Sequence, residues 1–207
     1  MGQNHNCVIR EDKTAWCWGY GGNGRLGHDS SVNTSRVVQV VGGDWEKIFA
    51  GGNHTCGIKN DQTLWCWGHG SYGQLGLGNT TSYDTPQQTE NHADWQKVAL
   101  GGVHTCGLRA GGQLHCFGRN QYGQVAGSTT TVKEPLHVMP GSLFVEVASG
   151  NVHSCAIKDD GTLWCWGRND DAQLGIGSSS GSFSTPQQVG TDTDWAALTL
   201  GNAHSCG

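Results

Sequence analysis

One sequence pattern recurs along this 207-residue chain about every 50 residues. The stretch HTCGIKNDQTLWCWG at 54–68 returns as HNCVIREDKTAWCWG at 5–19, HTCGLRAGGQLHCFG at 104–118 and HSCAIKDDGTLWCWG at 153–167, and HSCG closes the chain at 204–207. A period of this size is typical of propellers and solenoids, in which each repeat packs on the next. We therefore expect a single repeat domain, with modules at approximately 5–53, 54–103, 104–152 and 153–203 and a partial fifth module at 204–207.

Each module is predicted to form short antiparallel strands separated by turns. Apolar runs of four to six residues are bounded by Gly, Asn, Asp and Pro, and no long helical period is present. Glycine supplies 34 of the 207 residues, about twice the usual ~7%, which suits a fold rich in turns. The predicted fold class is all-β, a β-propeller of four-stranded antiparallel blades with about four blades in this chain, as a partial propeller or an assembly unit.

The paired cysteines are predicted to face each other across a hairpin. If 60–62 is a three-residue loop, Ile58 faces Leu64 and Cys56 faces Cys66, with Cβ atoms ~4.5–5.5 Å apart, close enough to bridge. Free buried thiols and a zinc site are the alternatives, although structural zinc usually takes four ligands from paired CxxC or HxxxH spacings. The expected disulfides are Cys7–Cys17, Cys56–Cys66, Cys106–Cys116 and Cys155–Cys165, with Cys206 unpaired or joined to another chain.

The repeated histidines and tryptophans are predicted to hold neighbouring blades together. The histidines lack metal-ligand spacing, so we expect each imidazole to hydrogen-bond the backbone between blades. The tryptophans are expected to pack between blades, because each ring buries a large area in a typical core. The repeated histidines are His5, His54, His104, His153 and His204.

These motifs together resemble the regulator of chromosome condensation repeat family. The family signature appears here as Gly51-Gly52-Asn53-His54, Trp67-Gly68 and Gly73-Gln74-Leu75-Gly76, and the last turn recurs at 24–27, 123–125 and 173–175. The resemblance covers the whole chain and implies a propeller of four-stranded blades, which in this family normally closes with seven. The cysteine-rich WCWG variant resembles the extracellular or bacterial-surface branch of the family.

The chain does not divide into a whole number of modules. It begins in the middle of a module at Gly2, and the segment 201–206 duplicates the motif of its first residues. We expect either a segment of a longer propeller or a unit that joins end to end with other copies, rather than a closed monomer.

Charge and composition argue against several classes of partner. The net charge is −5, and the 12 Lys and Arg residues are dispersed, whereas nucleic-acid binding needs a basic stripe. We expect neither nucleic-acid binding nor membrane insertion, since no apolar run is long enough to cross a bilayer. Oxidised cysteines predict an extracellular or cell-surface protein whose native signal segment is absent from this chain. Possible glycosylation sites are Asn33, Asn53 and Asn79.

No catalytic or cofactor motif is expected to be functional. Residues 19–24 and 68–73 match GxGxxG, but both run into the repeat turn rather than into a helix. The sequence contains neither HExxH nor GxSxG. We therefore predict a protein that is not an enzyme and that needs neither a cofactor nor a metal.

The favoured function is an extracellular interaction scaffold that binds protein partners through its blade-connecting loops. Tyrosines in three of these loops are candidate contacts, although they could simply cover the turns. The alternatives are a self-assembling unit of an extracellular ring or filament, and a carbohydrate-binding module. The candidate partner-binding rim comprises Tyr20, Tyr72, Tyr122, Arg168 and Asp170.

Overall fold

The structure is a computed structural model that describes residues 2–207, and its regular elements are strands and two single-turn 3₁₀ helices. The first sheet contains β1 (His5–Ile9), β2 (Ala15–Gly19) and β3 (Thr34–Gln39). The second contains β4 (Trp45–Ala50), β5 (His54–Lys59), β6 (Thr63–Gly68) and β7 (Tyr83–Ala93). The third contains β8 (Trp95–Leu100), β9 (His104–Arg109), β10 (Gln113–Gly118) and β11 (Val132–His137).

The fourth sheet contains β12 (Phe144–Ser149), β13 (His153–Lys158), β14 (Leu163–Arg168) and β15 (Ser182–Gln188), and β16 (Thr199–Leu200) pairs with β17 (Ser205–Cys206). The 3₁₀ helices are η1 (Gly22–Gly24) and η2 (Ala110–Gly112). Every sheet pairs strands that are consecutive in the chain, and every pairing is antiparallel. The prediction of an all-β propeller with four-stranded blades is confirmed. Among residues 2–207, no helix has the length and apolar character to cross a bilayer.

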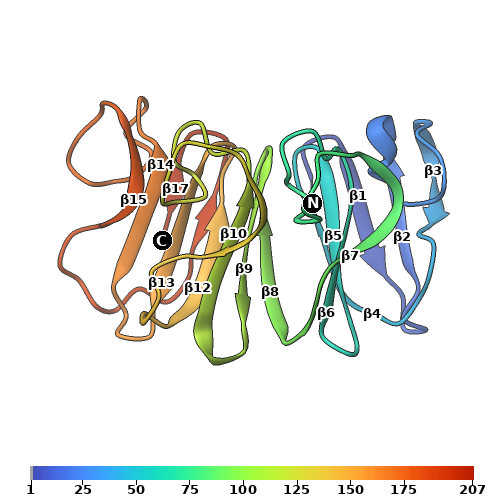
Figure 1. The fold of residues 1–207 in the computed structure, drawn as a ribbon, viewed down its shortest axis with the longest axis horizontal. Coiled ribbons are helices and arrows are strands. Elements are labelled where there is room, and N and C mark those ends of the chain that lie inside the picture. The colour runs from blue at the N-terminus through green and yellow to red at the C-terminus, as the bar shows by residue number, and fades with distance from the viewer. Residues whose placement is uncertain (1) are drawn as a thin grey trace.

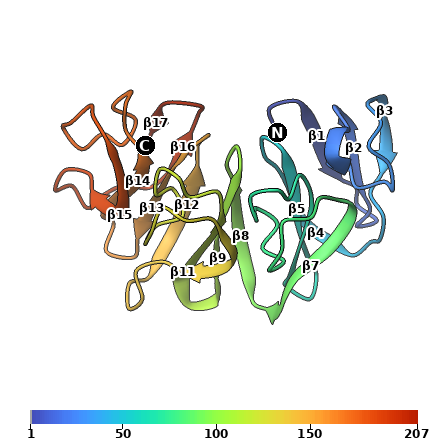
Figure 2. The ribbon, with the colours of Figure 1, turned by 45° about the horizontal axis from the view of Figure 1, so that its top comes forward.

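The sheets stand side by side as the blades of an open arc (Figure 1, Figure 2). The inner strands β4, β8, β12 and β16 line a common central groove. Within the described residues, β1 has β2 as its sheet neighbour and β16 has β17, so the first and last blades do not share a sheet. The chain therefore forms part of a propeller and is not a closed four-bladed ring.

The hairpins have the register that the cysteine spacing predicts. Ile58 pairs with Leu64 and Cys56 with Cys66, and the loop places Gln62 in the left-handed region at a φ of 64°. Glycines occupy the same position in the third and fourth blades, where a left-handed conformation costs least. The four hairpin disulfides are present, each with Cα atoms 4.1 Å apart, and Cys206 is free and exposed.

Each repeated histidine of the first four modules hydrogen-bonds to the next blade. His54 Nε2 lies 2.7 Å from Thr105 Oγ1, and that hydroxyl donates to the carbonyl of Gln74 at 2.8 Å. Because a hydroxyl has one proton to donate, it accepts from the ring, and Nε2 carries the ring proton. The same relay joins His5 to Thr55 and Arg25, His104 to Ser154 and Gln124, and His153 to Ser205 and Gln173.

This relay corrects the predicted partner of the histidines. The ring bonds a side-chain hydroxyl of the next blade, and the hydroxyl, not the ring, bonds the backbone. His54 and His104 are fully buried, and their pKa values are lowered to about 3, first by burial. The pKa values of His5 and His153 are lowered to about 4, again mainly by burial. The imidazoles therefore act as neutral hydrogen-bond donors between blades.

In the second and fourth blades, the last tryptophan of the WCWG motif packs against the preceding blade. Trp67 is fully buried against Leu26 and Ala15 of the first blade, and its Nε1 donates to the carbonyl of Arg25 at 3.1 Å. Trp166 makes the equivalent bond to Gln124 at 2.9 Å. The predicted packing of tryptophan between blades is therefore present in the structure.

Lowering the pH should destabilise the fold before the carboxylates titrate. Histidines of the unfolded chain titrate near pH ~6.5, and the four relay histidines titrate at about 3 to 4 in the fold. Between those values the unfolded state binds more protons, so the free energy of unfolding falls as the pH falls. Chemical denaturation at several pH values between about 7.5 and 4 measures this slope, and His104→Gln should reduce it. A free energy of unfolding that stays constant across the window would contradict the relay.

Non-reducing purification should leave one free thiol per chain, that of Cys206. Each hairpin disulfide closes a short loop and should stabilise the fold by ~2–4 kcal/mol on the chain-entropy model. We therefore expect the Cys56→Ala/Cys66→Ala variant to unfold at lower denaturant concentration, by an amount in that range. Thiol titration of the denatured, unreduced protein checks the count, and a count of nine would refute the bridges.

Candidate partner-binding face

One end of every blade carries its longest loops. The loops 20–33, 69–82, 119–131 and 169–181 lie at this end together with the short turns 51–53, 101–103, 150–152 and 201–204. Figure 1 shows the long loops at the top and the tight hairpins at the bottom. We call this end the rim face.

The Gly-Gln-Leu-Gly turn gives the long loops a fixed conformation. In the second blade Gly73 and Gly76 have φ values of 71° and 70°, which glycine adopts without strain. Leu75 is buried beneath the loop, and Gln74 Oε1 accepts from the backbone N–H of Tyr72 at 2.9 Å. The third blade repeats that last bond between Gln124 and the Tyr122 N–H at 3.0 Å. The turn therefore holds each tyrosine in a defined place.

Each predicted rim tyrosine is covered by an arginine. The guanidinium carbon of Arg119 in the third blade lies 4.7 Å from the ring centre of Tyr72 in the second. Arg168 in the fourth blade lies 5.7 Å from the ring of Tyr122. Cation–π contacts of this kind contribute roughly 0.5–1 kcal/mol at exposed sites. The tyrosines therefore do more than cover their own turns, because two of them link neighbouring blades.

The first blade uses a buried arginine for the same purpose. Arg25 lies 4.6 Å from the ring centre of Tyr20, and its Nη1 donates to the carbonyl of Gly52 in the next blade at 2.9 Å. Arg25 is 2% exposed, and burial lowers its pKa. The sequence analysis did not single out Arg25. The available signal was that arginine stands where the other three turns have glutamine: Gln74, Gln124 and Gln173.

The candidate residues Arg168 and Asp170 form a local pair. Arg168 Nε donates to Asp170 Oδ2 at 2.8 Å, and this bond raises the arginine pKa. Asp170 is exposed in the loop, and the next residue, Asp171, stands where the second and third blades have Tyr72 and Tyr122. Arg119 was not predicted from the sequence, although its position directly after Phe117-Gly118 matches that of Arg168.

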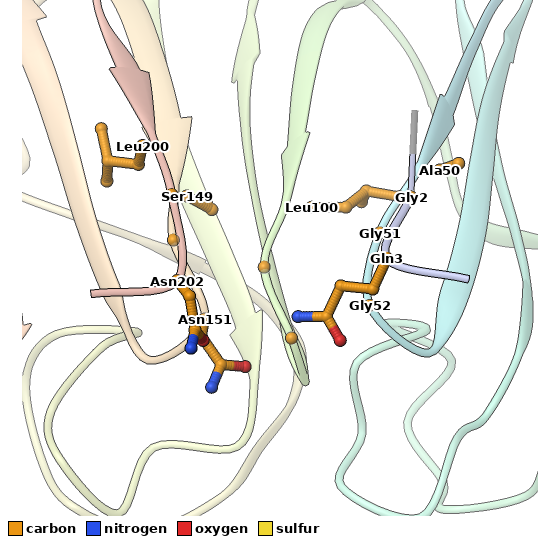
Figure 3. Close-up of a pocket in the computed structure, with 14 residues that line it drawn as sticks. Gly2, Gln3, Ala50, Gly51, Gly52, Leu100, Ser149, Asn151, Leu200 and Asn202 are labelled. Atoms are coloured by element: carbon orange, nitrogen blue, oxygen red, sulfur yellow. The ribbon is translucent and has the colours of Figure 1, made fainter. Parts of the chain in front are cut away.

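A hollow of about 260 Å³ lies at the centre of the rim face (Figure 3). Its walls are the short Gly-containing turns that follow the inner strands, and the amide side chains of Gln3, Asn151 and Asn202 line it. The backbone joins these turns from blade to blade, because Gly52 N donates to Gly101 O at 3.1 Å. The hollow therefore presents amide groups on a fixed frame, with the tyrosine–arginine pairs farther out.

The three candidate glycosylation sites differ in their surroundings. Asn79 is exposed in the loop 69–82. Asn33 is also exposed, and its Oδ1 accepts from Gly21 N at 3.0 Å. Asn53 is half-buried, and its Nδ2 donates to Gly102 O in the next blade at 3.2 Å. A glycan would attach to the side-chain nitrogen, and all three sites stay predictions.

Two family models match the chain over most of its length. The regulator of chromosome condensation (RCC1) repeat model matches residues 61–108, 111–157 and 160–207. A second model of the same repeat matches residues 1–25, 37–74, 95–124 and 144–173. No curated protein matches the chain.

Several solved structures share the fold. Prp20p from Saccharomyces cerevisiae matches with a TM-score of 0.89 and 21% identity, over 99% of this chain and 53% of its own. Human WBSCR16 matches with a TM-score of 0.86 and 22% identity, over 99% and 55%. The CRINKLY WD40 ectodomain of the Arabidopsis thaliana receptor kinase ACR4 matches with a TM-score of 0.56 and 20% identity, over 100% and 58%. The chain spans about half the length of these structures, and the likeness shows the fold alone.

Substituting Gly101→Ala should destabilise the frame of the hollow. A Cβ at this position would lie 2.3 Å from His104 Cε1 and 2.6 Å from Gly150 O, and such overpacking costs about 1–3 kcal/mol. Gly43→Ala is the matched control, because no atom lies within 4 Å of its added Cβ. Denaturant unfolding of both variants measures the difference, and equal stability would contradict the close packing of the turns.

Proposed function

The chain belongs to the regulator of chromosome condensation (RCC1) repeat family, and we propose that it is a non-enzymatic interaction scaffold. It binds protein partners through the loops of its rim face. Two of the matched structures are of one yeast protein, Prp20, whose reported partners are Gsp1p and histones in the first and Kap60 in the second. The partner of this chain depends on its own rim residues, because its overall identity to these structures is 21%.

The tyrosine–arginine pairs carry this proposal. Tyrosine and arginine are enriched among the residues that dominate binding energy at protein interfaces. Here three such pairs stand on one face, on loops that the buried turn residues hold in place. Tyr20 is 45% exposed, and Tyr72 and Tyr122 are half-buried with part of each ring accessible. A partner that contacts these rings pays little to order them, because they are already positioned.

The buried histidines support a role without catalysis. Histidine is the residue best suited to acid–base chemistry near neutral pH. In this chain four of the five repeated histidines bond a hydroxyl of the next blade, and burial lowers their pKa values to about 3 or 4. They hold the blades together beneath the short turns of the rim face.

The disulfides support a location outside the cytosol. Four bridges of this kind persist in oxidising compartments and are rare in the reducing cytosol. One matched structure of the same fold is the ectodomain of a receptor kinase. We therefore propose that this chain presents its rim face at the cell surface or in the extracellular medium.

Self-assembly is the alternative function, and the open edge of the first sheet favours it. No strand pairs with the inner edge of β1 among residues 2–207, and an unpaired edge is a template for another strand. Light scattering across a range of protein concentrations distinguishes the two functions. A mass that rises with concentration supports self-assembly. A constant mass of 22.0 kDa supports the interaction scaffold.

Replacing the rim residues should abolish binding to peptide ligands. We expect panning of a displayed peptide library on the intact chain to enrich peptides that do not bind the Tyr72→Ala/Arg119→Ala/Tyr122→Ala variant. The matched control is Gln96→Ala/Val145→Ala, which removes exposed side chains at the hairpin end of the blades. Loss of binding should exceed about tenfold, since residues at the centre of an interface contribute ~2 kcal/mol or more each.

Two results would contradict the proposal. One is a set of peptides that bind wild type and rim variant equally but lose affinity for the hairpin-end control. The other is a glycan array with hits that depend on the same tyrosines while no peptide is enriched, which would establish a carbohydrate-binding module instead. Intact mass and circular dichroism of each variant confirm that the four disulfides and the fold are kept.

A further inference from the structure

The third blade departs from a pattern that the other three blades share. In those blades the first tryptophan of the WCWG motif stands directly across from a glutamine of the outer strand. The indole Nε1 donates to a threonine hydroxyl at 2.8–2.9 Å, and a Lys or Arg lies over the ring. The cross-strand pairs are Trp16–Gln39, Trp65–Gln88 and Trp164–Gln188.

In the third blade both members of this pair are histidines. His115 on β10 stands across from His137 on β11, and their rings stack with centres 4.8 Å apart and planes at 12°. The threonine of the pattern is replaced by Gln113. Arg109, in the place of the cation, bonds Asp94 at 2.8 Å. The substitutions thus form a connected set on one face of one blade.

The histidine pair leaves two ring nitrogens without a partner. His115 Nδ1 and His137 Nε2 are both buried, and neither has a hydrogen-bond partner among the described residues. His115 is 6% exposed, and its pKa is lowered to about 4, first by burial and then by Arg109. An unsatisfied buried nitrogen destabilises the fold. Unpartnered imidazole nitrogens are ligands that zinc, copper and nickel ions favour.

The spacing of the two rings fits a shared ion. With metal–nitrogen distances of ~2.0–2.1 Å, two imidazoles on one ion have ring centres roughly 4.5–5.2 Å apart, which includes the observed 4.8 Å. The nearly parallel planes mean that one ring must turn to aim its nitrogen at the ion. His137 can do so, because β11 is the edge strand of its sheet and the side chain is only half-buried.

We propose that His115 and His137 form a binding site for a divalent transition-metal ion of the zinc type, with water completing the coordination. The site is separate from the rim face, since it lies on the strands of the third blade. It supplies two protein ligands, in keeping with the finding that residues 2–207 contain no group of three or more His, Cys, Asp or Glu placed to hold a metal. The disulfide-bonded cysteines are unavailable as ligands.

Titration calorimetry with zinc chloride tests the site on the intact, oxidised chain after dialysis against a chelator. Wild type should bind one zinc ion, and His137→Gln should bind it at least about tenfold more weakly, because one of two protein ligands is gone. Glutamine stands at the same position in three blades, so this variant should fold. His92→Gln, at an exposed histidine of β7, is the matched control and should leave the affinity unchanged.

Electron paramagnetic resonance with copper(II) supplies a second readout. The wild-type spectrum should show two imidazole nitrogens on the ion, and that of His137→Gln should show one. The double variant His115→Trp/His137→Gln restores the Trp–Gln pair of the other blades and should lose the site. Zinc affinity in that double variant equal to wild type would overturn the proposal. So would a wild-type protein that binds no zinc at about millimolar concentration.

Discussion

The hydrogen-bond relay from each histidine to the next blade sets the geometry on which the rest of the structure depends. His54, Thr105 and the carbonyl of Gln74 connect two blades at one point with two bonds of 2.7–2.8 Å. Such buried hydrogen bonds fix the orientation of one blade relative to the next. Leaving any of the bonded groups without a partner costs more free energy than the bond itself contributes. The relay lies directly beneath the short turns, and it thereby holds the central hollow and the first residues of the long loops in register.

The parts of the fold that sequence analysis predicts are those determined within one hairpin. Loop length fixes the pairing of Cys56 with Cys66, and the repeat then carries the same pairing to the other blades. The zinc and free-thiol alternatives fail for those cysteines because the register brings them together. Contacts between blades were harder to predict, since the partner of a ring such as His54 lies 51 residues away. The histidine spacing indicated a contact between blades without indicating which atom would accept the bond.

The arginine cover of the rim tyrosines and the histidine pair escaped prediction for related physical reasons. Tyr72 was recognisable as a loop residue, but its cover by Arg119 depends on the angle between blades. His137 follows a register shift between Cys116 and Gly118 in the pairing of β10 with β11. Counting from the loop therefore does not place His137 opposite His115. A β-bulge of this kind re-aims side chains without a clear mark in the sequence, so the pair becomes visible only in the folded sheet.

Departures from the repeat can be sorted by whether the fold compensates for them. Phe117 replaces a tryptophan, and the carbonyl of Gln74 thereby lacks the indole donor that the equivalent carbonyls receive. The Thr105 hydroxyl still satisfies that carbonyl, and the ring remains fully buried, so the change leaves no polar atom in need of a partner. The pair of His115 and His137 leaves two such atoms. The fold satisfies the matching positions in the other three blades, so it does not require the unpartnered nitrogens of the third blade. This difference between the blades locates the metal site that we propose.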